Sequence, residues 1–176
     1  FASEVRATSP DALLLAGDTA TAPSLATALT LLEGLLPCPI GFVLGNHDFY
    51  KGSLAAVRTE IAARTADSPS LRWLPSAGVI RVGETTAVLG VDGWADARCG
   101  DYSGSTVRLN DFRLILELRG LDAAERFNRL NALGNEEADL LRHLLTHAVD
   151  GYRRIVVVTH VPPFAEAAWH EGQPSA

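Results

Sequence analysis

The sequence predicts an α/β fold in which a parallel sheet is covered by helices. Three short, continuous apolar runs support this prediction: residues 12–16, 40–44 and 155–158. Runs of this length are typical of strands buried on both faces, as in parallel sheets that lie between helices. Segments with helical spacing follow the first two runs, so the chain alternates strand and helix.

Helix signals follow the first and second apolar runs. Residues 21–36 begin with Thr-Ala-Pro-Ser and then place leucine and alanine at helical spacing, which predicts a helix. Pro37 and Pro39 end it, because proline cannot continue a helix. A second helix is predicted over residues 54–64, with Ser53 as the candidate N-cap.

The second half of the chain adds an antiparallel hairpin and a long loop. Residues 79–82 and 85–91 flank Gly83-Glu84, which predicts a tight turn and makes the sheet mixed. Residues 92–120 are rich in glycine and longer than a simple connection, which favours a functional loop. The remaining expectations are helices over 111–118, 123–133 and 135–148, and a loop over 166–176.

Polar residues follow each predicted strand at its carboxyl end. Asp18 follows the first strand, Asn46, His47 and Asp48 follow the second, and His160 follows the third. Ligands of open α/β sheets bind beyond the carboxyl ends of the strands, so we expect these side chains to share one crevice. Carboxylate, amide oxygen and imidazole are ligands of divalent cations. The residue types therefore indicate a metal-dependent hydrolase.

Three blocks of sequence resemble the middle of the calcineurin-like metallophosphoesterase signature, which reads D-x-H, G-D, G-N-H-[DE], H, G-H-x-H: Gly17-Asp18, Gly45-Asn46-His47-Asp48 and Thr159-His160-Val161-Pro162-Pro163. The resemblance spans residues 11–172. It implies a layered α/β/β/α sandwich with mixed sheets and an active site at the C-terminal ends of the strands. The first and last blocks are absent and the chain has no methionine, so we expect residues 1–176 to be a single metallophosphoesterase domain, incomplete at both ends.

The resemblance also implies roles for the matching residues. Asp18 would bridge two metal ions, and Asn46 and His160 would bind one of them. His47 would stabilise the phosphoryl group or protonate the leaving oxygen, and the adjacent Asp48 is expected to orient its imidazole. The implied cofactors are two divalent ions, Mn, Fe or Zn, which activate water to hydrolyse a phosphomonoester or phosphodiester. We expect weak metal binding and little turnover from these residues alone, and two-metal activity from a longer chain.

Other aromatic and histidine residues have two interpretations each. Trp94 and His170 lie just past predicted strands, where they would line a substrate pocket, but Trp94 and Trp169 would equally pack loops onto the core. His143 and His147 are four residues apart on a predicted helix and share a face. No glutamate follows His143, so an ordinary helix flank is favoured over a zinc site.

Composition limits the class of protein. The 176 residues are 47% apolar and 20% charged, enough for one globular core, and no apolar stretch approaches a membrane span. The net charge of −6 is dispersed and no Lys/Arg cluster is present, so the expected partner is a small phosphoester and not a nucleic acid polymer. Cys38 and Cys99 are too few for a disulfide framework, and no secretory signal is visible, which favours the cytoplasm.

Two further functions stay open at this point. The fold is also used by protein-interaction modules that have lost catalysis, although an intact Asn46-His47-Asp48 argues against that reading. A nucleotide pyrophosphatase-type hydrolase would keep the metal site and stack a base on Trp94.

Overall fold

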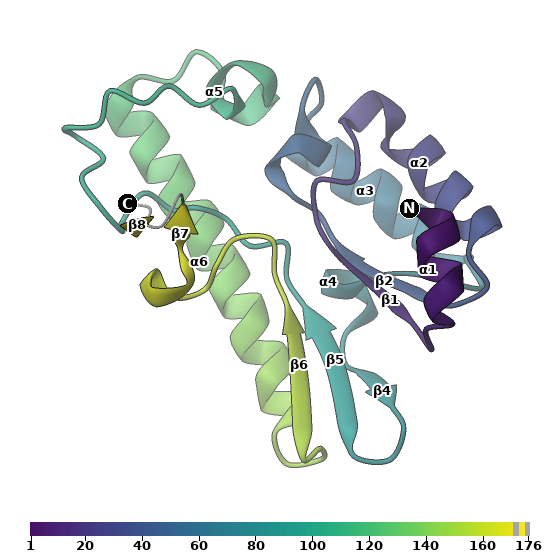
Figure 1. Ribbon diagram of the computed structural model, residues 1–176. Coiled ribbons are helices and arrows are strands. Elements are labelled where there is room, and N and C mark those ends of the chain that lie inside the picture. The colour runs from purple at the N-terminus through teal and green to yellow at the C-terminus, as the bar shows by residue number, and fades with distance from the viewer. Residues whose placement is uncertain (171–172, 175–176) are drawn as a thin grey trace.

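The strands β1 to β6 form two three-stranded sheets (Figure 1) in the computed structural model, which describes residues 1–170 and 173–174. The first sheet is entirely parallel and has the order β1-β2-β3. Its strands are β1 (Leu13–Ala16), β2 (Ile40–Val43) and β3 (Leu71–Trp73). The sequence predicted the first two, while β3 is additional.

The second sheet is mixed and has the order β4-β5-β6. The predicted hairpin is present as β4 (Ile80–Val82) and β5 (Thr86–Gly90), and β6 (Arg154–Val158) lies parallel to β5. A short antiparallel pair, β7 (Trp169–His170) and β8 (Gln173–Pro174), occurs where a loop was expected. The predicted mixed α/β fold with more than one sheet is therefore confirmed.

Two of the longer helices begin at residues whose side chains cap them. Ser53 accepts a hydrogen bond from the Ala56 backbone N–H at the start of the third helix, and Asp122 forms a capping box with Glu125 at the start of the longest. The α-helices are α1 (Ala2–Thr8), α2 (Ala22–Leu35), α3 (Leu54–Ala66), α4 (Leu74–Ala77), α5 (Asp111–Leu114) and α6 (Ala123–Ala148). Three 3₁₀ turns add η1 (Asn46–Phe49), η2 (Leu116–Leu118) and η3 (Ala165–Ala167). None of the helices in the described residues combines the length and apolar character of a membrane span.

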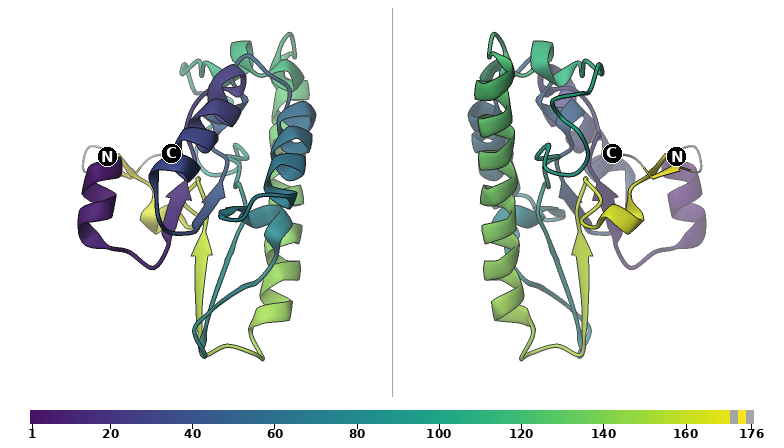
Figure 2. Two further views of the ribbon diagram at one scale, coloured as in Figure 1. Left: turned by 90° about the vertical axis from the view of Figure 1, so that its right-hand side faces the viewer. Right: turned by 90° about the vertical axis from the view of Figure 1, so that its left-hand side faces the viewer.

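A main core lies between the first sheet and the helices. Figure 2 shows α3 and α6 running along the same side of the strands. Phe42 of β2, Leu29 of α2, Ile61 of α3 and Leu133 of α6 are all fully or almost fully buried in this core. A smaller apolar cluster of Val43, Leu74, Val88 and Val158 joins the carboxyl halves of the two sheets. This cluster brings the ends of β2, β5 and β6 together.

Two sequence expectations about the elements were wrong. The helices expected over 123–133 and 135–148 are one continuous 26-residue helix, α6. It passes through Gly134, where an added Cβ would lie 2.6 Å from Cβ of Asp96. This glycine therefore permits a close contact with a loop and does not end the helix.

The expectation that all three apolar runs are buried on both faces was also wrong. Every residue of β2 is buried, but β1 and β6 are edge strands of their sheets in the described structure. Leu14 of β1 and both Val156 and Val157 of β6 are 40% exposed. The pattern of an apolar run alone does not reveal which strand has neighbours on every side.

Candidate metal-binding active site

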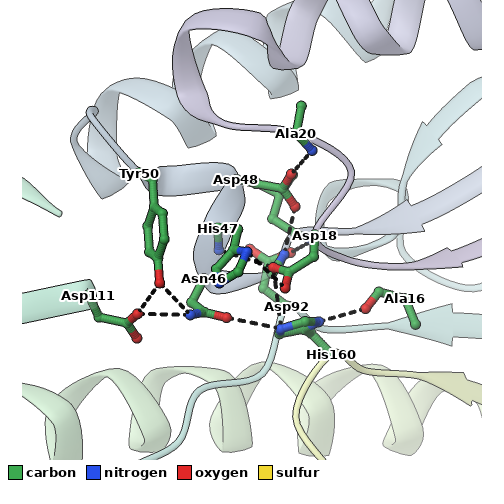
Figure 3. Close-up of polar contacts among 12 residues, drawn as sticks. Ala16, Asp18, Ala20, Asn46, His47, Asp48, Tyr50, Asp92, Asp111 and His160 are labelled. Carbon is green, nitrogen blue, oxygen red and sulfur yellow. Dashed lines mark hydrogen bonds and ion pairs between the residues drawn. The ribbon is translucent and has the colours of Figure 1, made fainter. Parts of the chain in front are cut away.

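Donor atoms from three separate segments meet at the carboxyl ends of the strands (Figure 3). His160, which follows β6, has its Nε2 atom 3.1 Å from Oδ1 of Asn46 and 3.5 Å from Oδ1 of Asp18. Asp18 follows β1, and Asn46 opens η1 after β2. The structure thus brings together the three residues for which the sequence predicted metal binding, although β6 belongs to the other sheet from β1 and β2.

The loop after β1 has a backbone shaped for this convergence. Gly17 has a φ of 90° and Asp18 a φ of 55°, both in the left-handed region. A Cβ on Gly17 would lie 2.6 Å from Nδ1 of His160, so only glycine allows the imidazole to approach. Aspartate tolerates the left-handed conformation better than most residues, which suits it to the position that follows.

Gly45, which follows β2, also leaves space for the donor side chains. A Cβ added there would collide with Oδ1 of Asp18 and would lie 2.8 Å from Cε1 of His160. Its φ of −98° is ordinary, so the requirement for glycine is one of space and not of backbone conformation. The glycines of both sequence blocks are thus explained by the close packing of the donor atoms.

A Gly45→Ala substitution is expected to weaken metal binding at least tenfold and to destabilise the fold by about 1 to 3 kcal/mol, because the added methyl group pushes the donors apart. Gly34→Ala is the matched control, since a Cβ there meets nothing within 4 Å and the position lies within α2. That control should bind metal normally and gain about 0.5 to 1 kcal/mol. Metal titration and thermal unfolding of both variants measure the difference, and equal metal affinity would contradict this account.

The hydrogen bonding of His160 leaves its second nitrogen available for a cation. Nδ1 lies 2.8 Å from the backbone oxygen of Ala16, and because a carbonyl only accepts, Nδ1 carries the proton. In the neutral ring, Nε2 then directs a lone pair toward the oxygens of Asn46 and Asp18. Three electron-pair donors facing one another repel unless a cation lies among them.

The spacing of these donors fits a divalent metal ion. Ligands about 2.1 Å from an ion are roughly 3.0 Å apart in octahedral and 3.4 Å in tetrahedral coordination. The separations from Nε2 of His160, 3.1 and 3.5 Å, match these values. Among the described residues, no group of three His, Cys, Asp or Glu side chains is placed to hold a metal. The donor set here contains one carboxylate and one imidazole, and its third member is the amide oxygen of Asn46.

His47 lies beside the donor residues and is partly exposed to solvent. Its backbone N–H donates to Oδ1 of Asp18 at 3.0 Å, and its Nδ1 lies 3.5 Å from the other carboxylate oxygen, Oδ2. The ring packs against Tyr50 with 4.4 Å between centroids. About half of the side chain, 53%, remains exposed, so the imidazole is accessible to a bound substrate.

The expected contact between Asp48 and the His47 imidazole is replaced by another arrangement. Oδ1 of Asp48 accepts the backbone N–H of Ala20, and Oδ2 accepts that of Gly45, both at 2.8 Å. The side chain is fully buried, and this burial raises the pKa of its carboxyl group. Asp48 therefore joins the loops after β1 and β2, while the carboxylate nearest the His47 ring is that of Asp18.

Asp92 is a buried residue of this region that sequence reasoning missed. Its Oδ1 accepts the backbone N–H of Leu44 at 2.8 Å and the indole N–H of Trp73 at 2.9 Å, and its backbone oxygen accepts the N–H of His160. Burial, with the charge of Glu137, raises the pKa of Asp92 to about 7. Asp92 is the second residue after β5, as Asp18 is the second residue after β1, so the sequence did carry a signal for it.

A second missed group lies behind Asn46. The Tyr50 hydroxyl donates to Oδ1 of Asp111 at 2.6 Å, and Nδ2 of Asn46 donates to the same oxygen at 2.9 Å. Burial and the bond to Asp111 raise the pKa of Tyr50, so the phenol stays protonated. Tyr50 is four residues from Asn46, but Asp111 is 65 residues away and no local pattern marks it.

The remaining candidates lie outside the donor cluster. Trp94 packs against the main core, with its ring centroid 6.0 Å from that of Phe49, which favours the packing interpretation. Trp169 is 61% exposed, and its indole N–H donates to the backbone oxygen of Glu166 at 2.7 Å. His143 and His147 are exposed on α6, where Nδ1 of His147 lies 2.8 Å from the backbone oxygen of His143. The side chain of His170 lies outside the described residues.

A mixed α/β fold with carboxylate, amide and imidazole donors at its strand ends defines a protein of the metallohydrolase type. The family model for calcineurin-like phosphoesterases matches residues 2–176, and the chain belongs to this family. Members of the family are metal-dependent hydrolases of phosphoesters. Comparison with curated proteins and with solved structures found no match.

Proposed function

We propose that this protein hydrolyses small phosphomonoesters or phosphodiesters with water activated by two divalent ions, Mn, Fe or Zn. The observation that carries this proposal is the convergence of Asp18, Asn46 and His160, with Nε2 of His160 within 3.5 Å of both oxygens. When bound, the ions lower the pKa of water and neutralise phosphoryl oxygens. The chain's own residues supply the rest of the chemistry.

In this proposal, Asp18, Asn46 and His160 bind the cations and His47 contacts the substrate. Asn46 and His160 would hold one ion. The two oxygens of Asp18 lie near different residues, Oδ1 near His160 and Oδ2 near His47. Such a carboxylate suits a bridge between two ions. His47 then donates to a phosphoryl oxygen or gives its proton to the leaving oxygen.

The charge balance of these residues favours an anionic substrate. Asn46 and His160 are neutral as ligands and Asp18 contributes one negative charge, so divalent ions leave a net positive site. A phosphoester is drawn to such a field. Cys38 and Cys99 are both free thiols, which accords with work in a reducing cytoplasm.

Metal removal tests the proposed function. Protein purified from the full-length gene should contain metal and hydrolyse aryl phosphate mono- or diesters, lose that activity on dialysis against a chelator, and regain it with Mn²⁺, Fe²⁺ or Zn²⁺. Mg²⁺ is the comparison ion, since it binds nitrogen donors poorly. A folded protein that takes up none of these ions and cleaves neither ester would overturn the proposal and favour an interaction module.

A further inference from the structure

The amide of Asn46 can act as a metal ligand only in one of its two orientations. Its oxygen donates an electron pair to a cation, whereas its NH₂ group has none to give. The two ends of a carboxamide are nearly equal in size, so shape alone does not select between them. Some neighbour must therefore distinguish oxygen from nitrogen.

The neighbours on the far side of the amide are suited to this selection. Oδ1 of Asp111 accepts from Nδ2 of Asn46 at 2.9 Å, and the Tyr50 oxygen lies 3.3 Å from the same nitrogen (Figure 3). A carboxylate oxygen can only accept. The Tyr50 hydroxyl has its proton committed to Asp111 at 2.6 Å, so toward Asn46 it too can only accept.

These contacts hold the amide oxygen on the opposite side, 3.1 Å from Nε2 of His160. If the amide turned over, its oxygen would face the carboxylate of Asp111 and its NH₂ group would face the metal position. The first contact is repulsive and the second cannot bind a cation. Only the observed orientation satisfies both sides.

We propose that Asp111 is a positioning residue that fixes the Asn46 carboxamide with its oxygen toward the metal ion. This inference rests on the proposed function, because it assigns Asn46 as a ligand. Asp111 touches neither the reacting atoms nor the metal position and acts through Asn46. Tyr50 assists by holding the Asp111 oxygen that receives the amide.

The backbone around Asp111 is fixed to the segment that carries Asn46. The Lys51 N–H donates to the backbone oxygen of Leu114 at 2.7 Å, and the Leu116 N–H donates to that of Gly52 at 3.0 Å. Asp111 itself is 9% exposed, so water competes little for its carboxylate. The long connection after β5 thus places the side chain of Asp111 on the side of Asn46 that faces away from His160.

The test is Mn²⁺ affinity, measured from the electron paramagnetic resonance signal of free Mn²⁺ during titration of the metal-free protein expressed from the full-length gene. Asp111→Leu keeps similar volume but removes the acceptor, and it should weaken Mn²⁺ binding about 10- to 100-fold, as loss of an outer-sphere partner does. Arg113→Leu is the matched control on α5, where the exposed side chain has no contact with Asn46, and its affinity should be unchanged.

Repeating the Asp111→Leu substitution in a second variant distinguishes a positioning role for Asp111 from a role in stabilising the fold. In an Asn46→Asp background the ligand has two equivalent oxygens and needs no orientation. Asp111→Leu should then leave Mn²⁺ affinity unchanged or improve it, because a neighbouring carboxylate is removed. A purely structural role predicts weaker binding in both backgrounds, and that result would overturn the inference.

Two milder variants keep the test decisive if Asp111→Leu does not fold. Asp111→Asn can turn its own amide and should lose affinity by about three- to tenfold, and Tyr50→Phe should lose less, since Asp111 remains. Unchanged affinity in both, with tight binding by the unaltered protein, would overturn this inference alone. Absence of Mn²⁺ binding by the unaltered protein would overturn the proposed function with it.

Discussion

Replacing Asp18 with asparagine in protein from the full-length gene is expected to remove bound metal and to lower aryl phosphate hydrolysis by about 10³-fold or more, since the ions supply several kcal/mol of charge stabilisation. Asparagine is the informative choice. It tolerates the left-handed φ of 55° at this position and retains an acceptor for the His47 backbone N–H. Alanine would add backbone strain and confuse loss of a ligand with loss of structure.

Metal analysis and steady-state kinetics on Asp18→Asn should be accompanied by the same measurements on Asp139→Asn. That substitution removes an equal charge from the exposed surface of α6 and should change neither quantity. An Asp18→Asn protein that keeps its full metal content and turnover would show that this carboxylate is not a ligand.

Replacing His47 with alanine is expected to lower kcat by about 10²- to 10⁴-fold while bound metal stays the same. The imidazole is half exposed and is held beside Asp18 with 3.5 Å between Nδ1 and Oδ2, so it can reach a substrate without being needed to hold an ion. His143→Ala is the matched control, because that histidine is exposed on α6, away from the donor cluster.

A series of aryl esters distinguishes the two roles open to His47. If His47 protonates the leaving oxygen, the loss in His47→Ala should be small for nitrophenyl esters and large for esters of less acidic phenols. If it stabilises phosphoryl charge, the loss should not depend on the leaving group. Loss of metal in this variant would instead make His47 a ligand and contradict both roles.

Elements with strong local signals were predicted well. The strand β2 is a continuous apolar run. The helices after it and before it have the expected residues Ser53 and Thr21 as their N-caps. The strand β3 was missed because Leu71-Arg72-Trp73 is too short to show a period, and it exists through its pairing with β2. A break in α6 was expected at Gly134 because glycine often marks the end of a helix. The sequence alone does not show whether a glycine ends a helix or permits a close contact with another segment.

In the site too, residues with a local sequence signal were predicted, and contacts between residues far apart in the sequence were not. Asp18, Asn46 and His160 were found because each follows a strand, and the prediction that they share a crevice needed only the rule that strand ends hold ligands. The partners of Asp48 are backbone N–H groups, which have no signature in sequence. Asp111 is 65 residues from Asn46 in the sequence, so its hydrogen bond to Asn46 could be recognised only in the folded structure.

The loop between β5 and α5 contains an exposed stretch, residues 103–110, and contacts the rest of the protein before and after it. Before it, Nδ2 of Asn131 donates to the backbone oxygen of Asp96 at 2.7 Å, and Tyr102 stacks near Phe127 with 5.3 Å between ring centroids. After it, Asp111 is buried behind Asn46, while residues 103–110 are exposed. A protease would cut within this stretch, and the two pieces would remain one folded particle because neither anchor depends on the severed peptide.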